Sequence, residues 1–169
     1  PVGNNYDNGN HTFQEHINSI SGLWLRYPVG YHFAYSNLGV DLAGYILQKQ
    51  SGIPFEVFFF FLVLLPLDMR LSTFSMNRIT QDLTRAIGRL QGVDSLPTEI
   101  PMIPAGGLYS NAAEMANYLR FHLNNGMFNR QEIIQSEILE EMYRVTFPEL
   151  NQSFGYCLGL WKQKIGDTY

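Results

Sequence analysis

The run from Val57 to Leu65 consists of nine apolar residues without interruption and ends at Pro66. A helix that crosses a membrane needs about 20 apolar residues, so this run is too short for that role. Pro54 suits the first turn of a helix, and Glu56 lies near the positive end of the helix dipole. The segment therefore predicts a buried core helix of a globular protein, and we expect no transmembrane segment in this chain.

The composition is that of a folded chain. Of the 169 residues, 46% are hydrophobic, and twelve Phe, ten Tyr and two Trp supply more apolar surface than a disordered chain carries. Eleven Lys and Arg against fifteen Asp and Glu give a net charge of −4, which argues against binding to nucleic acid. A single cysteine, Cys157, excludes an internal disulfide. The length suits one domain or a large piece of one.

A helix is predicted to follow Asn37 and to end at Ser51 and Gly52. Asn37 is in the position of an N-cap, and glycine commonly follows the last turn of a helix. Ala43 and Leu47 widen an apolar stripe at helical spacing, so we expect this helix to be buried on most sides. The stripe consists of Leu38, Leu42, Tyr45 and Ile46.

Two further helices are predicted from their boundaries. Asn111 and Glu114 have the spacing of a capping box, with Asn in place of Ser or Thr. The helix that they open is expected to stop at Asn124-Asn125-Gly126, because these residues readily adopt a left-handed backbone. A later helix is predicted to begin at Ser136 and to run through Met142.

Residues 70–100 give the weakest structural signal. Four charged residues indicate a solvated helix face, namely Arg78, Asp82, Arg85 and Arg89. Three prolines then exclude regular structure before Ala105, namely Pro97, Pro101 and Pro104.

The C-terminal part of the chain indicates a change of secondary structure. The stretch from Phe154 to Trp161 is aromatic and interrupted by glycine, so it is predicted to be a strand. The chain is therefore expected to be helical over about residues 11–145 and to enter a sheet over about residues 153–169. Because it opens on Pro1 without Met and closes in a strand-like segment, we expect residues 1–169 to be one partial domain, an internal fragment.

The histidines and the glycine-rich stretch give weak signals for chemistry. His11 and His16 are five residues apart, off a common helical face, and no carboxylate completes a ligand set, so we expect no metal. His122 lies among Leu, Met and Tyr and is interpreted as a packing residue. Gly106 and Gly107 lack the following Lys and the spacing of a phosphate-binding loop.

The stretch around Tyr35 and Asn37 is more informative. It presents a phenol and a carboxamide two positions apart, directly before the predicted helix. Alternate residues of an extended backbone point to the same side, so we expect the two side chains to face one cavity. A tyrosine titrates near pH ~10, but cationic neighbours favour the phenolate, which can then accept a proton. The amide of Asn37 has the donor and acceptor that orient a carbonyl group.

The chain resembles the serine β-lactamase family, especially class C enzymes and their esterase and D-aminopeptidase relatives. The resemblance extends over nearly the whole chain and rests on short pieces in family-like order and spacing. They are Pro28-x-Gly30-x-x-Phe33-x-Tyr35-Ser36-Asn37-x-Gly39, Leu42-Ala43-Gly44-Tyr45-Ile46, Ser51-Gly52, Leu65-Pro66-Leu67-x-Met69, Ala105-Gly106-Gly107-Leu108-Tyr109-Ser110 and Phe154-Gly155-Tyr156-x-Leu158-Gly159-Leu160-Trp161.

This resemblance implies an α+β fold of the β-lactamase/transpeptidase type, with most of the helical domain and the beginning of the antiparallel sheet in this chain. It implies hydrolysis of amide or ester bonds through an acyl-enzyme formed on the serine of a Ser-x-x-Lys motif. Tyr35 would take the proton of that serine and help activate water. Asn37 would bind the substrate's carbonyl and steady the lysine, and Gly106 and Gly107 would belong to the substrate site. No cofactor is implied.

The chain departs from the family pattern in two places. No serine is followed three residues later by lysine, so the nucleophile motif is absent from these residues and we expect the chain alone to be inactive. Lys164-Ile165-Gly166 matches the family's Lys-x-Gly strand only superficially, and we expect the third motif to lie beyond Tyr169.

Two other functions stay open at this point. One is a catalytically inactive relative that binds a peptide or a peptidoglycan fragment in the same cleft, and the other is a helical interaction module with an accidental Tyr-Ser-Asn. A small-molecule or peptide substrate is the partner that the resemblance implies. The sequence leaves the oligomeric state and the compartment open, although the family analogy weakly favours an exported or membrane-associated protein.

Overall fold

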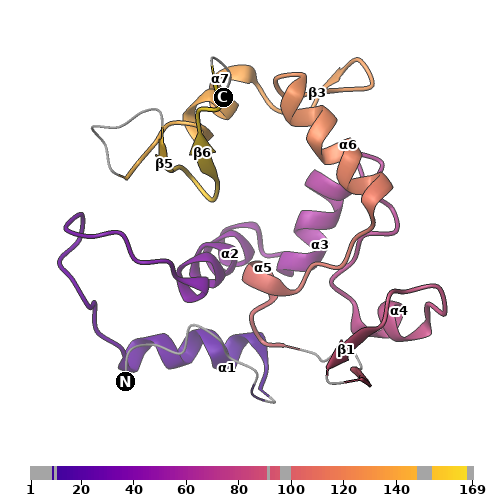
Figure 1. Ribbon diagram of the computed structural model, residues 1–169. Coiled ribbons are helices and arrows are strands. Elements are labelled where there is room, and N and C mark those ends of the chain that lie inside the picture. Colours follow the sequence, from indigo (N-terminus) through magenta and orange to yellow (C-terminus); the bar gives the residue numbers. More distant parts are fainter. Residues whose placement is uncertain (1–8, 10, 91, 96–99, 148–153, 167–169) are drawn as a thin grey trace. The chain divides into compact units, whose positions relative to one another are not determined.

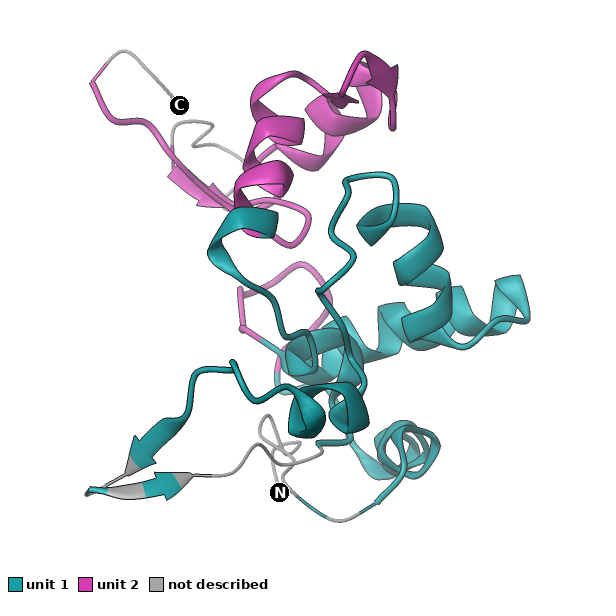
Figure 2. Cartoon of the chain, turned by 90° about the vertical axis from the view of Figure 1, so that its right-hand side faces the viewer, with its two compact units in different colours: residues 1–26, 36–114 teal, residues 27–35, 115–169 magenta. Residues whose placement is uncertain are grey.

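The computed structural model describes residues 9, 11–90, 92–95, 100–147 and 154–166 (Figure 1). The chain forms two compact units, each discontinuous in sequence (Figure 2). Unit 1 comprises Pro1–Arg26 and Ser36–Glu114, and unit 2 comprises Tyr27–Tyr35 and Met115–Tyr169.

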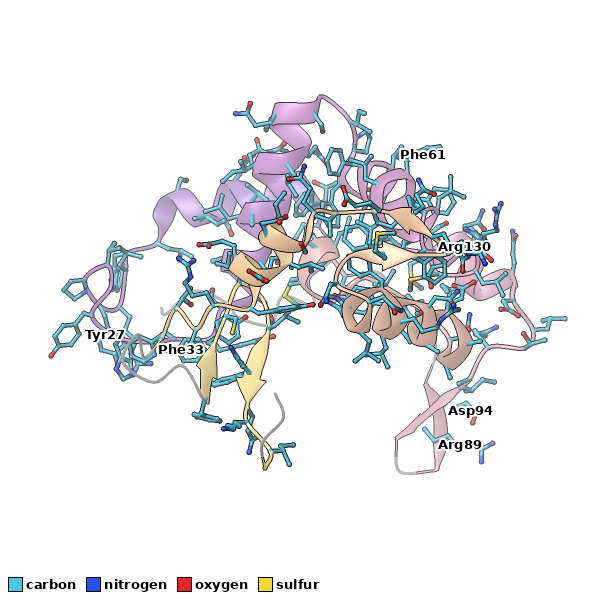
Figure 3. The ribbon with its side chains drawn as sticks, turned by 90° about the horizontal axis from the view of Figure 1, so that it is seen from above. Tyr27, Phe33, Phe61, Arg89, Asp94 and Arg130 are labelled. Atoms are coloured by element: carbon cyan, nitrogen blue, oxygen red, sulfur yellow. The ribbon has the colours of Figure 1, made fainter. Side chains whose placement is uncertain are left out.

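Unit 1 consists mainly of helices, with one β-hairpin among its described residues. Its elements are α1 (Phe13–Asn18), the 3-10 helix η1 (Ser19–Gly22), α2 (Asn37–Ser51), α3 (Phe55–Phe59), the π-helix η2 (Phe60–Leu64), α4 (Met76–Gln81), β1 (Gly88–Leu90), β2 (Val93–Ser95) and α5 (Ile103–Gly106). In the β1–β2 hairpin, Arg89 lies opposite Asp94, and their side chains form an exposed ion pair of 3.0 Å (Figure 3).

The ends of α2 lie close to the predicted positions. Gly52 caps the C-terminus with a left-handed backbone, as predicted (φ 69°). The N-cap is one residue earlier than predicted: Ser36 has an extended backbone, and its hydroxyl accepts the N–H of Gly39 at 3.0 Å. Asn37 is therefore the first residue of the helix and does not cap it.

The buried face of α2 is polar, contrary to the prediction from the apolar stripe. Its buried residues are Asn37, Asp41 and Gly44, spaced at i, i+4 and i+7. Leu42 and Ile46 are instead exposed by 38% and 52%. Periodicity identified the helix correctly, but it assigned the wrong face to the interior, because a buried carboxylate with partners can replace an apolar residue.

The apolar run from Val57 to Leu65 is helical but only partly buried. α3 ends at Phe59, and the run continues as a π-helix in which the N–H of Leu65 bonds to the carbonyl of Phe60. Leu64 is almost fully buried, whereas Phe61 and Leu62 are 58% and 56% exposed. The prediction of a core helix is therefore wrong for the middle of the run.

Residues 70–107 are more regular than predicted. The helix α4 ends at Gln81, with Asp82 as its C-cap, so the four charged residues from Arg78 to Arg89 do not share one helix face. Arg89 lies on β1 instead. The prolines also fail to exclude regular structure, because Pro104 occupies the first turn of α5. In the first turn the backbone N–H groups make no bond within the helix, so the missing N–H of proline breaks none.

The helix α6 (Ala112–Leu123) begins in unit 1 and continues into unit 2. The other elements of unit 2 are β3 (Met127–Phe128), β4 (Gln131–Glu132), α7 (Ser136–Met142), β5 (Phe154–Tyr156) and β6 (Trp161–Gln163). The left-handed stop after α6 is confirmed, with φ of 50° at Asn125 and 89° at Gly126. The start of α7 at Ser136 is confirmed as well.

The stretch from Phe154 to Trp161 forms a hairpin and not a single strand. β5 and β6 pair antiparallel, with Tyr156 opposite Trp161, and Gly159 in the turn has a φ of 77°. Unit 2 also holds the β3–β4 hairpin, and unit 1 holds the β1–β2 hairpin, both inside the region expected to be helical.

No single helix in the described part of the chain combines the length and the apolar character that a membrane crossing requires. Asn37–Ser51 and Phe55–Leu64 meet this requirement only together, as a pair bent by 84°.

Candidate functional site

The Tyr-Ser-Asn sequence lies where the loop Tyr27–Tyr35 enters α2. Ser36 has an extended backbone, with φ −146° and ψ 110°. Tyr35, the last residue of this segment of unit 2, is 55% exposed, so its ring is not packed in the interior. Asn37, the second residue of the adjoining segment of unit 1, is 7% exposed.

The loop that leads to Tyr35 is fixed within unit 2 by aromatic packing. The loop contains a turn in which the N–H of Tyr31 bonds to the carbonyl of Pro28 at 3.1 Å, and Gly30 has a φ of 77°. Phe33, labelled in Figure 3, then contacts three aromatic rings, with centroids between 4.9 and 6.0 Å away. They belong to Phe147, Tyr156 and Trp161. The segment just before Tyr35 is thereby tied to the β5–β6 hairpin.

Within unit 1, Asp41 connects three segments that are distant in sequence. It lies one helical turn after Asn37 and is fully buried. Its Oδ2 contacts His16 Nε2 of α1 at 3.0 Å, and its Oδ1 accepts the backbone N–H of Ala105 in α5 at 2.9 Å. One carboxylate thus fixes α1 and the Ala105–Gly107 segment relative to the start of α2.

The two glycines proposed for the substrate site lie at the end of α5. Gly106 is its last residue and is exposed, and Gly107 is the C-cap. A Cβ atom at Gly107 would lie 2.9 Å from the carbonyl oxygen of Ile103, closer than real contacts allow. Only glycine fits this position without moving the backbone, which keeps the chain after α5 close to that helix.

Glu114 fixes the continuation of this segment. As predicted, Asn111 caps the helix: its side chain accepts the N–H of Glu114 at 3.0 Å. The glutamate side chain does not close the predicted capping box. Its carboxylate instead accepts the backbone N–H groups of Leu71 and Ser72, both at 2.7 Å, and the Ser72 hydroxyl at 2.6 Å.

A backbone bridge completes this connection in unit 1. Thr73 and Tyr109 exchange two backbone hydrogen bonds of 2.9 Å each, and the hydroxyls of Ser72 and Ser110 are 2.7 Å apart. Residues 105–110 are therefore held at one end by Asp41 and at the other by the loop after Met69.

Within unit 1, Asp41 connects the helix that begins at Asn37 with the segment that contains Gly106 and Gly107, whereas Tyr35 belongs to unit 2. The chemical roles of all four residues stay predictions. Sequence reasoning missed Asp41, His16 and the long-range contacts of Glu114. A signal for Asp41 was present, because an aspartate within a helix expected to be buried requires a partner.

His122 is surrounded by aromatic side chains of unit 2. His122 packs against Tyr118 and Phe121, and its Nδ1 lies 2.5 Å from the Tyr143 hydroxyl, which agrees with its interpretation as a packing residue. Burial lowers the pKa of His122 and raises the pKa of Tyr143. In the described residues, no group of three or more His, Cys, Asp or Glu is placed to hold a metal ion.

Comparison with known proteins identifies the class. The family model described as Beta-lactamase matches residues 2–167. Beta-lactamase-like protein 2 of Dictyostelium discoideum is 31% identical over 132 residues, which are 74% of this chain and 23% of the relative. The D-alanyl-D-alanine-carboxypeptidase/endopeptidase AmpH of Escherichia coli (strain K12) is 26% identical over 111 residues, or 66% of this chain and 28% of AmpH.

A solved structure supports the same family and fold. The octameric penicillin-binding protein homologue from Pyrococcus abyssi superposes with a TM-score of 0.70 at 27% identity, over 89% of this chain and 35% of that one. The fold is thus the α+β fold of the β-lactamase/transpeptidase type, as predicted. The chain belongs to the beta-lactamase family of serine hydrolases and spans between 23% and 28% of the length of the two curated relatives.

Proposed function

We propose that this chain is part of a serine hydrolase that cleaves amide or ester bonds through an acyl-enzyme. The family of the chain supports this reaction class. The nucleophile would be the serine of the family's Ser-x-x-Lys motif, which does not occur among the 169 residues. The chain would supply the second motif, Tyr35-Ser36-Asn37.

Each of these residues has a separate task in the proposed mechanism. Tyr35, as the phenolate, takes the proton of the serine hydroxyl as that oxygen attacks the acyl carbon, and passes it to the amine or alkoxide that leaves. It then takes a proton from the water that attacks the acyl-enzyme and returns that proton to the serine oxygen as the acid is released. Its exposed ring is accessible for such a transfer. The buried amide of Asn37 donates to the carbonyl of the substrate and accepts from the lysine of the nucleophile motif.

The observation that carries the proposal is the connection of Asn37 to the Ala105–Gly107 segment through Asp41. Asn37 begins the helix in which Asp41, one turn later, binds the N–H of Ala105. A catalytic arrangement needs polar groups held in fixed positions before the substrate binds. A buried carboxylate with two directional contacts provides such a constraint between Asn37 and Gly106–Gly107.

We infer the substrate class from the relatives. AmpH is named as a D-alanyl-D-alanine carboxypeptidase and endopeptidase. A D-amino-acid peptide, a related ester or a β-lactam presents the same acyl carbon to an activated serine. The proposed substrate is therefore a small acyl compound of this class.

The test uses the whole protein that contains this segment, assayed with a D-alanyl-D-alanine peptide, p-nitrophenyl acetate and nitrocefin. Loss of a general base lowers kcat by about 10²–10⁴-fold, so Tyr35→Phe should do so with little change in KM. Asn37→Ala should lower kcat by about 10²–10³-fold. Tyr31→Phe is the matched control, because it removes another exposed phenol from the same loop. Equal activity of Tyr35→Phe and Tyr31→Phe would contradict the proposal.

The isolated chain provides a second test. Since it has no Ser-x-x-Lys, it should not hydrolyse nitrocefin or p-nitrophenyl acetate. Turnover by the purified chain that Tyr35→Phe abolishes would show that a nucleophile is present among these residues, against the proposal.

The alternative is a protein that binds a peptide or peptidoglycan fragment without cleaving it, and it would apply if the whole protein lacked Ser-x-x-Lys. A single measurement on the whole protein distinguishes the two functions. Saturable binding of a D-alanyl-D-alanine peptide with no product after prolonged incubation would support the binding protein, whereas release of D-alanine would support the hydrolase.

A further inference from the structure

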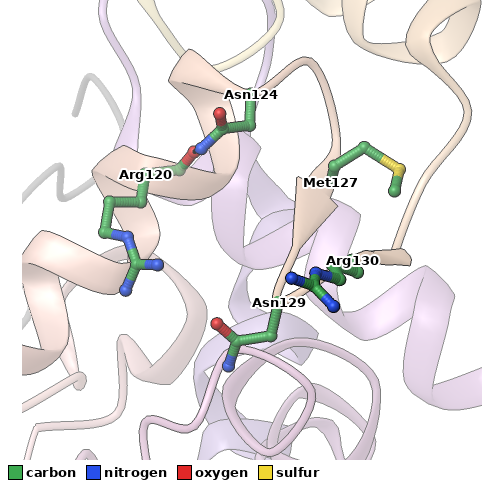
Figure 4. Close-up of a pocket in the computed structure, with 5 residues that line it drawn as sticks. All are labelled: Arg120, Asn124, Met127, Asn129 and Arg130. Carbon is green, nitrogen blue, oxygen red and sulfur yellow. Dashed lines mark hydrogen bonds between the residues drawn. The ribbon is translucent and has the colours of Figure 1, made fainter.

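A small open pocket lies in unit 2, between the end of α6 and the β3–β4 hairpin (Figure 4). Its volume is about 350 Å³. The lining side chains are two guanidinium groups, two carboxamides and a thioether, from Arg120, Asn124, Met127, Asn129 and Arg130. No acidic side chain is among them, so the lining combines positive charge with hydrogen-bond donors.

Arg120 is held beside the pocket by its surroundings. Its guanidinium lies over the ring of Phe128, 5.2 Å from the centroid, and Phe128 is only 4% exposed. Among the described residues, this guanidinium forms one long hydrogen bond, from Nη1 to the side-chain oxygen of Asn117 at 3.4 Å. Most of its five donors are therefore available to a ligand.

Neither arginine of the pocket has a carboxylate partner in the described part of the chain. The ion pairs there are His16–Asp41, Arg70–Asp68, Arg89–Asp94 and Arg144–Glu141. Glu132 is the acidic residue of the hairpin itself, opposite Met127 on β4, and it forms no ion pair with Arg120 or Arg130. The pocket is thus a local positive site on a chain whose net charge is −4.

The backbone at Arg130 adds an independent observation. Asn129 and Arg130 form the two-residue turn between β3 and β4, with φ of 49° and 66°. Asn is common at the first position of such a turn, but the second position strongly favours glycine, because other residues are strained at positive φ. At this position a glycine would be less strained than the arginine, so the presence of arginine indicates a function for its side chain.

We propose that this pocket binds a small oxyanion with two negative charges, either a phosphate monoester or a dicarboxylate. The planar guanidinium groups of Arg120 and Arg130 form paired hydrogen bonds with oxyanions of both kinds. The Asn129 carboxamide adds donors, as does the amide proton of Asn124 that is not used in its 2.6 Å bond to the Arg120 carbonyl. Two positive groups match two negative charges, so a monocarboxylate binds more weakly.

The test uses the isolated chain and three probes: inorganic phosphate, succinate and acetate. Binding is followed through the backbone amide NMR signals of residues 120–132, at constant ionic strength maintained with NaCl. We expect saturable shifts in this segment with phosphate or succinate and at least about tenfold weaker binding of acetate. Saturation with phosphate alone would identify the phosphate monoester, and saturation with succinate alone the dicarboxylate.

Two variants separate binding from folding. Arg130→Gly removes one guanidinium and relieves the positive φ, so binding should weaken by about tenfold or more while the urea midpoint of unfolding rises. Arg120→Gln should weaken binding similarly. Arg144→Gln is the matched control, because Arg144 is an exposed arginine of unit 2 that pairs with Glu141 away from the pocket lining.

Two results would overturn the proposal. One is a linear, non-saturating response to phosphate and succinate alike, which would show only ionic effects. The other is equal affinity of Arg130→Gly and Arg144→Gln, which would place the ligand elsewhere. Both measurements are independent of hydrolysis, so their failure leaves the proposed acyl-enzyme function untouched.

Discussion

The two units are stabilised by different kinds of contact. In unit 1, the buried carboxylates of Asp41 and Glu114 accept backbone N–H groups from segments 64 and 42 or 43 residues away in sequence. In unit 2, rings from distant segments surround Phe33 and His122, and backbone hydrogen bonds such as that from Leu158 N–H to the carbonyl of Met142 lie beside them. Buried carboxylates thus bind distant backbone groups in the unit that holds Asn37, whereas ring contacts and backbone hydrogen bonds join the segments of the unit that holds Tyr35.

This difference has an energetic consequence. A buried carboxylate that is removed leaves its donors without partners, and each unsatisfied buried group costs about 1–3 kcal/mol. An aromatic pair contributes only about 0.5–1.5 kcal/mol beyond its buried area. Single substitutions at the carboxylates of unit 1 should therefore be more damaging than changes to individual pairs in unit 2.

The largest effect is expected for Asp41→Ala. Removing one partner of a buried pair costs about 3–5 kcal/mol, and here the N–H of Ala105 loses its acceptor as well. Asp41→Asn is the matched control, because it keeps an oxygen for Ala105 and should cost less. Urea unfolding followed by segment-resolved hydrogen exchange measures both. Equal protection of α1 and α5 in the two variants would show that the carboxylate is not the connection we describe.

A somewhat smaller effect is expected for Glu114→Ala. The N–H groups of Leu71 and Ser72 lose their acceptor, and we expect a loss of about 2–4 kcal/mol. Glu114→Gln retains one acceptor oxygen and should lose less. Hydrogen exchange at Leu71 and Ser72 is the direct measurement. If exchange at Leu71 and Ser72 stayed slow in Glu114→Ala, the carboxylate would not be what protects them, and the proposed difference between the two units would be wrong.

Gly44→Ala tests the close approach of α2 and α5 in unit 1. Alanine favours a helix over glycine by about 1 kcal/mol, but its Cβ would lie 2.4 Å from Cγ of Pro104, whose ring cannot move away easily. Overpacking costs about 1–3 kcal/mol, so we expect a net destabilisation of about 1 kcal/mol.

Gly39→Ala is the control for this substitution, because its Cβ would meet only Ser36 atoms at 3.6 Å, an ordinary contact. It should leave the chain as stable or slightly more stable in the same urea titration. Stabilisation by both substitutions would show that α5 yields easily, and the connection between α2 and α5 would then be looser than described.

The sequence predicted those parts of the fold that are decided locally. The glycine cap at Gly52, the stop at Asn125-Gly126 and the start at Ser136 depend on one or two residues each, and all three are confirmed. The inward face of α2 was predicted wrongly, because it depends on partners of Asp41 that lie 25 and 64 residues away. Local pattern contains no information about such partners.

The candidate site was predictable to a similar extent. The resemblance identified the family, and it pointed to the segment that contains Tyr35 and Asn37. The spacing at Asn111 predicted the cap correctly, but Glu114 uses its carboxylate for residues 42 and 43 positions earlier. A capping pattern specifies where a helix begins, whereas tertiary contacts decide what a long side chain on it binds.

The smallest effect is expected in unit 2, from the protonation of His122. Burial lowers its pKa below the ordinary value of 6.5, so the unfolded chain binds the proton more readily than the folded chain. The stability that the neutral ring contributes is fully present above pH 6.5 and is lost as the pH falls through the lowered pKa. The urea midpoint of unit 2, followed by exchange in α6 and α7, should therefore decrease from pH 7.5 to 5.0. His122→Gln removes the titrating ring and should show a smaller decrease. If the urea midpoints of the original chain and of His122→Gln decreased equally with falling pH, groups other than His122 would cause the acid sensitivity. The protonation of His122 would then not distinguish unit 2 from unit 1.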